Sequence, residues 1–225
     1  MLRAVIFDID GTLVDSNDLH ARAWQQAFQH FGIDIPFARV RSQIGKGGDQ
    51  LIPALISPEK NKEIGKELSE YRSKLFKEKY LDQVRGFPQV RELFLRILSD
   101  GRQIALASSA NEDELRRLKQ AANISDLIDE QTSADDADKS KPHPDIVEAA
   151  LQRLHVDADE ALMVGDTPYD AIAATRLHVR TIGVLCGGFS ESDLRGAGCI
   201  EIYQSPADLL AQYQRSALAE TSLAA

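Results

Sequence analysis

Cysteine is scarce in this sequence, and so is positive charge. The chain has two cysteines, Cys186 and Cys199, in 225 residues. Such a pair gives neither a disulfide framework nor the spacing of a metal site, so we expect two small, buried, hydrophobic side chains in a reducing compartment. Lys and Arg number 26 against 35 Asp and Glu, a formal net charge of -9, and they are scattered along the chain. Without a basic stripe to hold a phosphate backbone, nucleic acid is not an expected partner.

Long hydrophobic runs are also missing. The apolar stretches, such as residues 4–7, are strand-length and far shorter than the ~20 residues that span a membrane. The N-terminus shows no apolar signal region with a basic flank, so we expect a cytoplasmic protein without a membrane partner. With 43% hydrophobic and 27% charged residues, the composition excludes disordered and fibrous classes and allows one compact unit, or a core with a small appended domain.

What the sequence does contain is an alternation of short strands and helices. Four β-rich apolar runs stand out, at residues 3–7, 103–107, 161–164 and 179–185. Stretches of helical periodicity lie between them, one with an apolar stripe from Val90 to Leu98 and another opened by Pro168. Strands that alternate with helices predict an α/β fold, with a doubly wound, mostly parallel, Rossmann-like sheet covered on both faces.

The stretch from residue 16 to residue 85 breaks this rhythm. It has no convincing strand, and apolar residues recur at helical spacing around Trp24 and again around Leu68. Ser57 followed by Pro58 marks the start of the second helix, with serine as the cap and proline in the first turn. We therefore expect an α/β core domain, an inserted all-helical cap domain with a hinge at each end, and a flexible low-complexity tail. Their boundaries are residues 1–15 and 86–215 for the core, 16–85 for the cap, 15–17 and 84–88 for the hinges, and 216–225 for the tail.

Two carboxylates follow the first strand directly. Asp8 and Asp10 are two residues apart, so in an extended segment both point to the same side, and Gly11 permits a tight turn after them. The carboxyl ends of parallel strands form the ligand-binding edge of an open sheet. The pair can therefore serve chemistry, although capping of a turn explains it about as well when the motif is taken alone.

Three further polar clusters lie in loops of the predicted sheet. Ser108 and Ser109 follow the second strand and offer hydroxyl and backbone N–H groups to a phosphate oxygen, although ordinary helix capping also explains them. A fixed ammonium such as Lys141 can neutralise a phosphoryl group, although an isolated loop lysine is usually solvated. Asp166 and Asp170 bracket the start of a later helix, where two acids suit Mg²⁺ or merely stabilise the helix end.

The order of these clusters carries a family resemblance. DIDGT at Asp8, a hydroxyl at Ser108, a lysine at Lys141 and GDTPYD at Asp166 resemble the four signature motifs of the haloacid dehalogenase-like hydrolase superfamily. The resemblance spans the whole chain and includes a helical cap between the first and second motifs. It implies that Asp8 is a nucleophile that attacks phosphorus and forms an aspartyl-phosphate, while Asp10 acts as general acid and base.

The resemblance also implies a Mg²⁺ cofactor and its ligands. Asp8, the backbone carbonyl of Asp10 and the carboxylate of Asp166 would hold the ion. Asp170 would bind it through water or support the other ligands.

The remaining residues of the pattern are assigned to the phosphoryl group and the substrate. Ser108 and Lys141 would bind the transferring oxygens, with Ser109 beside them as a substrate contact. The resemblance therefore implies a Mg²⁺-dependent phosphatase that acts on a small phosphorylated metabolite, either a sugar phosphate or a phosphoglycolate-like acid. Halide displacement is disfavoured, because it needs neither Asp10 as an acid nor Asp166 as a metal ligand.

Two residues of the expected cap are further candidates for substrate binding. Lys46, in the glycine-rich segment from Gly45 to Asp49, can approach the leaving group, unless the segment is only a flexible turn. His20 lies in LHARAW, which is similar to the start of the cap in beta-phosphoglucomutases and hexose-phosphate phosphatases, and it can hydrogen-bond near Asp10, unless it has no role. A phosphomutase is therefore the alternative function. The arginine expected after the glycine-rich segment to grip a second phosphate is absent, which favours hydrolysis.

Overall fold

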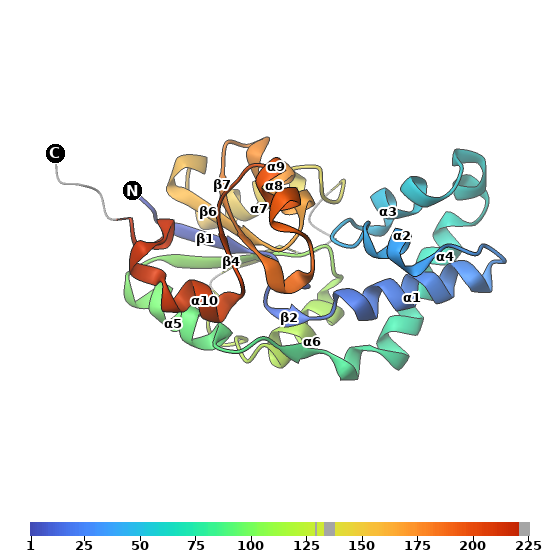
Figure 1. Cartoon of the computed structure of the whole chain (residues 1–225), viewed down its shortest axis with the longest axis horizontal. Coiled ribbons are helices and arrows are strands. Elements are labelled where there is room, and N and C mark those ends of the chain that lie inside the picture. The colour runs from blue at the N-terminus through green and yellow to red at the C-terminus, as the bar shows by residue number, and fades with distance from the viewer. Residues whose placement is uncertain (129, 133–137, 221–225) are drawn as a thin grey trace.

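A parallel six-stranded sheet forms the centre of the molecule (Figure 1). The computed structural model describes residues 1–128, 130–132 and 138–220. The strand order is β5-β4-β1-β6-β7-β8. The strands are β1 (Ala4–Phe7), β4 (Gln103–Ala107), β5 (Glu130–Thr132), β6 (Ala161–Gly165), β7 (Arg180–Val184) and β8 (Cys199–Tyr203). In this order β1 lies in the middle, β4 and β5 extend the sheet on one side, and β6, β7 and β8 extend it on the other. The order confirms the predicted doubly wound sheet.

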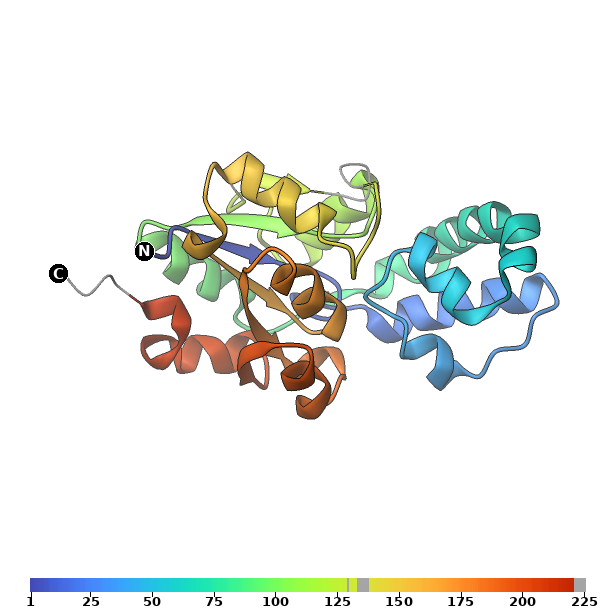
Figure 2. The same ribbon diagram turned by 90° about the horizontal axis from the view of Figure 1, so that it is seen from above.

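Side chains that alternate along the strands point to opposite faces of the sheet and pack into two separate hydrophobic clusters. The helices are α5 (Val90–Ser99), α6 (Glu112–Ala121), α7 (Asp145–Leu154), α8 (Pro168–Thr175), α9 (Glu191–Gly196) and α10 (Pro206–Ala211). Val5 and Phe7 of β1 belong to the larger cluster, with helices α5, α6 and α10. Ala4 and Ile6 belong to a second cluster with α7 and α8, as the period of two in a strand requires. Figure 2 shows these helices on both sides of the strands.

Two strands of the sheet were not predicted, and each lies at an edge. β5 has the sequence EQT, three residues without a strongly apolar side chain. β8 has the sequence CIEIY, in which Ile200 is 42% exposed. Edge strands need only one buried face and one partner, so their hydrophobic signal is weaker than that of the central strands.

Residues 17–79 form four helices that lie beyond the carboxyl ends of the strands, at the right in Figure 1. They are α1 (Asn17–His30), α2 (Phe37–Arg41), α3 (Gly48–Leu55) and α4 (Pro58–Lys79). As predicted, Ser57 caps α4, and its side chain accepts a hydrogen bond from the backbone N–H of Lys60 at 3.3 Å. Trp24, Phe28 and Leu68 belong to a hydrophobic cluster made by residues 17–79 alone, which is typical of a segment with its own small core.

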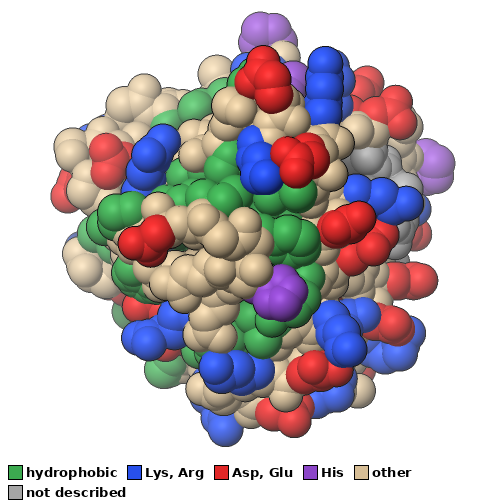
Figure 3. All heavy atoms as spheres, turned by 90° about the vertical axis from the view of Figure 1, so that its right-hand side faces the viewer, with side chains coloured by type: hydrophobic (Ala, Val, Ile, Leu, Met, Phe, Trp, Pro, Cys, Tyr) green, Lys and Arg blue, Asp and Glu red, His purple; other side chains and the backbone are tan. Residues whose placement is uncertain are grey.

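The outer end of this helical segment carries hydrophobic side chains among charged ones (Figure 3). Partly buried hydrophobic residues pack against the cluster: Phe31, Ile33, Phe37, Ile56 and Tyr71. None of the helices in the described part of the chain is both long and apolar enough to cross a membrane.

A two-stranded antiparallel ribbon joins the helical segment to the sheet. β2 (Val14–Asp15) pairs with β3 (Arg85–Gly86). The chain therefore enters and leaves the helical segment at neighbouring positions. The predicted hinge regions, residues 15–17 and 84–88, overlap this ribbon. Two-residue strands are too short to give a hydrophobic period, so the sequence pattern did not reveal them.

The C-terminal segment differs from the expected flexible tail over residues 216–220. Ala217 and Leu218 are buried in the main hydrophobic cluster, and Ala217 N–H donates to Glu201 Oε2 at 3.0 Å. Glu220 accepts from Arg180 Nη2 at 2.8 Å. The low-complexity pattern misled the prediction because a single leucine that reaches the core and two polar contacts suffice to dock a short segment. Residues 221–225 lie outside the described residues.

Candidate active site

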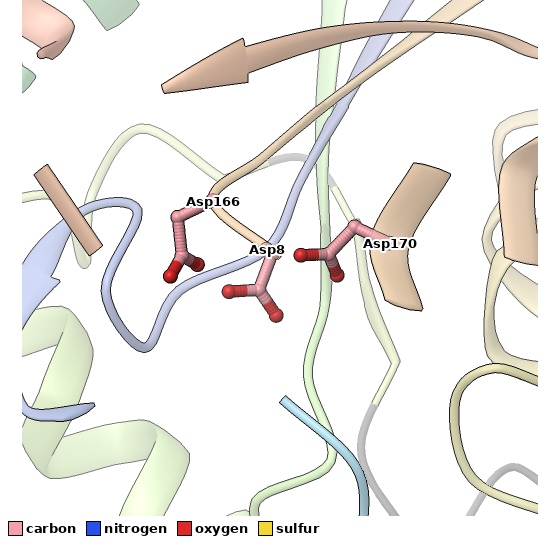
Figure 4. Close-up of side chains that lie close together, drawn as sticks. All are labelled: Asp8, Asp166 and Asp170. Carbon is pink, nitrogen blue, oxygen red and sulfur yellow. The ribbon is translucent and has the colours of Figure 1, made fainter. Parts of the chain in front are cut away.

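Three buried aspartates converge at the carboxyl edge of the sheet (Figure 4). Asp8 follows β1, Asp166 follows β6, and Asp170 lies in the first turn of α8. One carboxylate oxygen from each lies within 4.8 Å of the others. In Figure 4 the three carboxylates lie around a common space. The predicted strand-end clusters therefore meet in space.

Lys141 reaches the same point from the loop before α7. Its Nζ lies 2.5 Å from Asp8 Oδ1 and 2.7 Å from Asp170 Oδ1, and the side chain is 1% exposed. Burial would lower the pKa of Lys141, but Asp170 and Asp8 outweigh it and raise the pKa. The residue is a buried ammonium between two carboxylates, which excludes the interpretation as a solvated loop lysine.

The aspartates carry more negative charge than this lysine offsets. Burial, opposed by Lys141 and reinforced by Asp170 and Asp10, raises the pKa of Asp8 to about 7. Burial and the neighbouring Asp8 and Asp170 raise the pKa of Asp166 well above its usual value. A hard divalent cation takes carboxylate oxygens as ligands and would offset this excess, so the donor set fits a metal site.

Thr12 and Asn17 hold the Asp166 carboxylate in place. Asn17 Nδ2 donates to Asp166 Oδ2 at 2.7 Å. Thr12 Oγ1 lies 2.9 Å from Asp166 Oδ1 and 3.2 Å from Asp8 Oδ2, and its single proton serves one of them at a time. Gly11 has φ +81, and a Cβ there would lie 2.4 Å from Asp166 Oδ2, so only glycine fits. The roles of Thr12 and Asn17 were not predicted from the sequence, although Thr12 stands inside the DIDGT motif.

Asp10 points away from this cluster toward the helical segment. Its Oδ1 lies 2.8 Å from His20 Nε2 and 2.5 Å from Ser16 Oγ. Arg72 contacts His20 Nδ1 with Nη2, and because a guanidinium only donates, Nδ1 accepts and Nε2 carries the proton given to Asp10. Burial would raise the pKa of Asp10, but His20, Ser16 and Arg72 together hold it below its usual value. The predicted contact between His20 and Asp10 is therefore present, and Asp10 is a carboxylate ready to accept a proton.

The serine cluster divides into two environments. Ser108 is 1% exposed, and its Oγ accepts from Ala110 N–H at 3.1 Å. Asn111 caps α6 by accepting from Glu114 N–H at 3.1 Å. Ser109 lines a cavity, and its Oγ is buried without a hydrogen-bond partner among the described residues. Ser109 is thus the serine of the cavity wall and has an unpaired hydroxyl, whereas the assignment of the phosphate hydroxyl to Ser108 stays a prediction.

A cavity of about 70 Å³ lies between the aspartates and the helical segment. Asp8, Asp10 and Ser109 line it from the sheet side, and His20, Trp24, Arg72 and the segment Ile44–Gly48 line it from the helical side, with Glu114 and Ala110 completing the wall. Lys46 Nζ donates to Gln43 Oε1 at 2.6 Å and lies 4.6 Å from the Tyr169 ring centroid. Burial lowers the pKa of Lys46. The glycine-rich segment is thus a wall of the cavity, and Gly48 and Asp49 belong to α3 rather than to a turn.

Arg72 and Glu114 form an ion pair between the helical segment and the core that the sequence pattern did not reveal. Arg72 lies in α4 and Glu114 in α6, and Arg72 Nη1 is 3.8 Å from Glu114 Oε1. Their side chains are 12% and 2% exposed. Each stands in a helix rich in charged residues, so only the packing of the two helices against each other distinguishes them from solvated neighbours.

Comparison with known proteins identifies the family. A family model for haloacid dehalogenase-like hydrolases matches residues 5–184. The chain belongs to the haloacid dehalogenase-like hydrolase family. The expected resemblance is confirmed.

Relatives of this haloacid dehalogenase-like hydrolase cover most of its length. It is 32% identical over 191 residues to a phosphoglycolate phosphatase from Yersinia pestis, covering 83% of this chain and 82% of the relative. It is 30% identical over 185 residues to a putative pyrophosphatase from Caldanaerobacter subterraneus, covering 81% of each chain.

Solved structures confirm the fold of the hydrolase. A hydrolase from Pseudomonas syringae superposes with a TM-score of 0.87 at 28% identity, covering 95% of this chain and 98% of that one. A putative beta-phosphoglucomutase from Bacteroides vulgatus gives a TM-score of 0.86 at 23% identity, covering 97% and 91%. The second likeness shows the shared fold alone.

Proposed function

We propose that the protein is a Mg²⁺-dependent phosphatase that hydrolyses small phosphorylated metabolites through an aspartyl-phosphate on Asp8. The observation that carries the proposal is the position of Asp8. Its carboxylate lines the cavity, contacts the buried Lys141 ammonium and stands beside Asp166 and Asp170. The names of the relatives, phosphoglycolate phosphatase and pyrophosphatase, support phosphoric ester or anhydride hydrolysis as the chemistry.

In the first step a carboxylate oxygen of Asp8 attacks phosphorus, and the bond from phosphorus to the leaving-group oxygen breaks. The negative charge of the bound phosphate favours the protonated form of Asp10, and Asp10, positioned by His20, would give that proton to the oxygen as it departs. Lys141, with Ser108 or Ser109, would bind the equatorial phosphoryl oxygens and offset their charge. Asp8, Asp166, the carbonyl of Asp10 and, directly or through water, Asp170 would hold Mg²⁺, which supplies positive charge to the phosphoryl group when bound.

In the second step water attacks the phosphorus of the aspartyl-phosphate, and the bond from phosphorus to Asp8 oxygen breaks. Asp10 takes a proton from that water and so regains the proton it gave in the first step. The carboxylate state of Asp10, held by His20 and Ser16, is the form this step needs. His20 is thus a positioning residue for Asp10.

Residues 16–85 act in this proposal as a cap domain over the cavity. They contribute His20, Trp24, Lys46 and Arg72 to its wall, and the β2–β3 ribbon provides the two hinges. Closing of the cap excludes water from the phosphoryl centre until the intermediate has formed. Lys46 would contact the leaving group. A cytoplasmic location is part of the proposal, because both cysteines are free, as is usual for proteins in a reducing compartment.

The phosphomutase alternative is less favoured. A mutase must grip a second phosphate, and after the glycine-rich segment the chain offers Asp49 and Gln50 rather than an arginine. Lys46 is already paired with Gln43 and the Tyr169 ring. The solved structure named as a putative beta-phosphoglucomutase is 23% identical to this chain, and a likeness at that level supports the shared fold rather than a mutase activity.

Phosphate release from a general aryl phosphate tests the proposal. The wild-type enzyme should release phosphate from p-nitrophenyl phosphate only when Mg²⁺ is present. Activity that survives exhaustive chelation, or glucose 1-phosphate isomerisation with negligible phosphate release, would overturn it.

A further inference from the structure

The cavity wall carries polar atoms that no protein group satisfies. Among the described residues, five buried side-chain nitrogen or oxygen atoms lack a hydrogen-bond partner. Three of them, Ser109 Oγ, Arg72 Nε and Glu114 Oε1, belong to residues that line this one cavity. Buried polar groups are normally paired, so a group of unpaired atoms around one cavity marks the contacts that a ligand is expected to make.

The Arg72 guanidinium is fixed in orientation and partly offset in charge. It lies 5.2 Å from the Trp24 ring centroid and 5.0 Å from that of Phe76, and it contacts His20. The Glu114 carboxylate at 3.8 Å balances its charge but is too far for a hydrogen bond. Arg72 therefore keeps a free N–H donor, and Glu114 keeps a free acceptor.

We infer that Glu114, Arg72 and Ser109 select a leaving group that carries hydroxyls and reject one that carries a carboxylate or a second phosphate. A hydroxyl can donate to Glu114 Oε1 and accept from Arg72 Nε–H, while Ser109 Oγ can do either. A carboxylate or phosphate only accepts, and it would bring negative charge against the buried Glu114. The substrate class is thus a phosphorylated polyol or sugar, and this inference rests on the proposed phosphatase function.

The cavity has room for a short leaving group. Its volume of about 70 Å³ holds only a few water-sized groups, since one water needs about 10–15 Å³ on this measure. A short polyol chain fits this space as the structure stands. The inference separates this chain from relatives named for phosphoglycolate and pyrophosphate, whose leaving groups are anionic.

A matched pair of esters tests the selection. 2-Hydroxyethyl phosphate and 2-phosphoglycolate have the same two-carbon chain and differ in a terminal hydroxyl or carboxylate. The wild type should hydrolyse the hydroxyl ester with a kcat/KM at least about tenfold higher. In Glu114→Gln, which keeps the shape and removes the charge, that ratio should fall by about tenfold, mainly through a lower KM for phosphoglycolate. Glu112→Gln removes the same charge at an exposed position of the same helix and should leave the ratio unchanged.

Hydrolysis of p-nitrophenyl phosphate separates this inference from the proposed function. If the aryl ester is hydrolysed but phosphoglycolate is preferred, or Glu114→Gln leaves the ratio unmoved, the selection is wrong and the phosphatase function stands. If neither the aryl ester nor either two-carbon ester is hydrolysed, the function fails, and the calorimetric affinities of wild-type protein for the two-carbon esters decide the selection in place of kcat/KM. Equal affinities, or no binding of either ester, overturn it. The wild-type ratio decides the question even if Glu114→Gln does not fold.

Discussion

Asp8 and Asp10 are two residues apart, one buried and one half-buried, and their surroundings have opposite effects on their pKa values. Asp8 faces Asp166 and Asp170, and its pKa is raised to about 7. Asp10 faces the helical segment, where His20, Ser16 and Arg72 outweigh burial and hold its pKa below the usual value. The difference shows that the sheet edge carries excess negative charge, which a cation would offset. The helical segment instead supplies the groups that stabilise Asp10 as a carboxylate. One strand end thus supplies two carboxylates with two different tasks.

The largest effect is expected from Asp8→Asn, which removes the nucleophile and keeps its shape. Activity should fall by at least about 10⁴-fold, while the fold remains as judged by circular dichroism. Asp34→Asn, at an exposed position in the helical segment, is the control and should retain wild-type turnover. Full activity of Asp8→Asn would show that the two aspartates do not differ as described.

The metal requirement tests the charge excess around Asp8 directly. Mg²⁺ at 100 times its Kd should stabilise the wild type by about 2.7 kcal/mol, measured as a rise in melting temperature, and chelation should abolish activity. Asp166→Asn should lose most of this stabilisation because it removes a ligand and part of the excess charge. His20→Asn should keep it, because His20 serves Asp10. Equal losses in both variants would contradict the division between the two regions.

His20→Asn should weaken the Asp10 side of the comparison alone. An alkyl ester needs a proton on its departing oxygen, whereas p-nitrophenolate leaves readily without one. We therefore expect kcat for 2-hydroxyethyl phosphate to fall about 10- to 100-fold, and kcat for p-nitrophenyl phosphate to fall about tenfold less. A parallel loss on both esters would indicate general damage to the fold instead.

The smallest effect concerns the helical segment away from the site. Ser57→Ala removes the cap of α4 and should lower the free energy of unfolding by about 1 kcal/mol, measured by urea denaturation. Ser73→Ala, in the interior of the same helix, should be neutral or slightly stabilising. Neither should change kcat. A large loss of activity in Ser57→Ala would mean that the geometry of the cavity depends on the start of α4 more than its contacts indicate.

The sequence predicted the parts of the site that lie at the ends of central strands. Asp8 and Asp166 follow strongly apolar runs, and a parallel sheet brings such ends to one edge by its topology. Lys141 was predicted through the family resemblance, because a loop lysine has no spacing that would reveal its burial.

Arg72 and Glu114 could not be predicted in the same way. Both lie in highly charged helices, and their burial follows from how α4 packs against α6. Edge strand β8 and the docked residues Ala217 and Leu218 were missed for a related reason. Their place depends on tertiary contacts, and their local pattern resembles that of exposed segments.

Trapping the covalent intermediate tests the central claim most directly. Enzyme turning over 2-hydroxyethyl phosphate with Mg²⁺ is quenched in acid and treated with borohydride, which reduces an aspartyl-phosphate to homoserine. Mass spectrometry of the peptide containing Asp8 should then find homoserine at that position, and none in Asp8→Asn. Active enzyme that shows no reduction product at Asp8, or shows it at Asp10 or Asp166, would contradict the account.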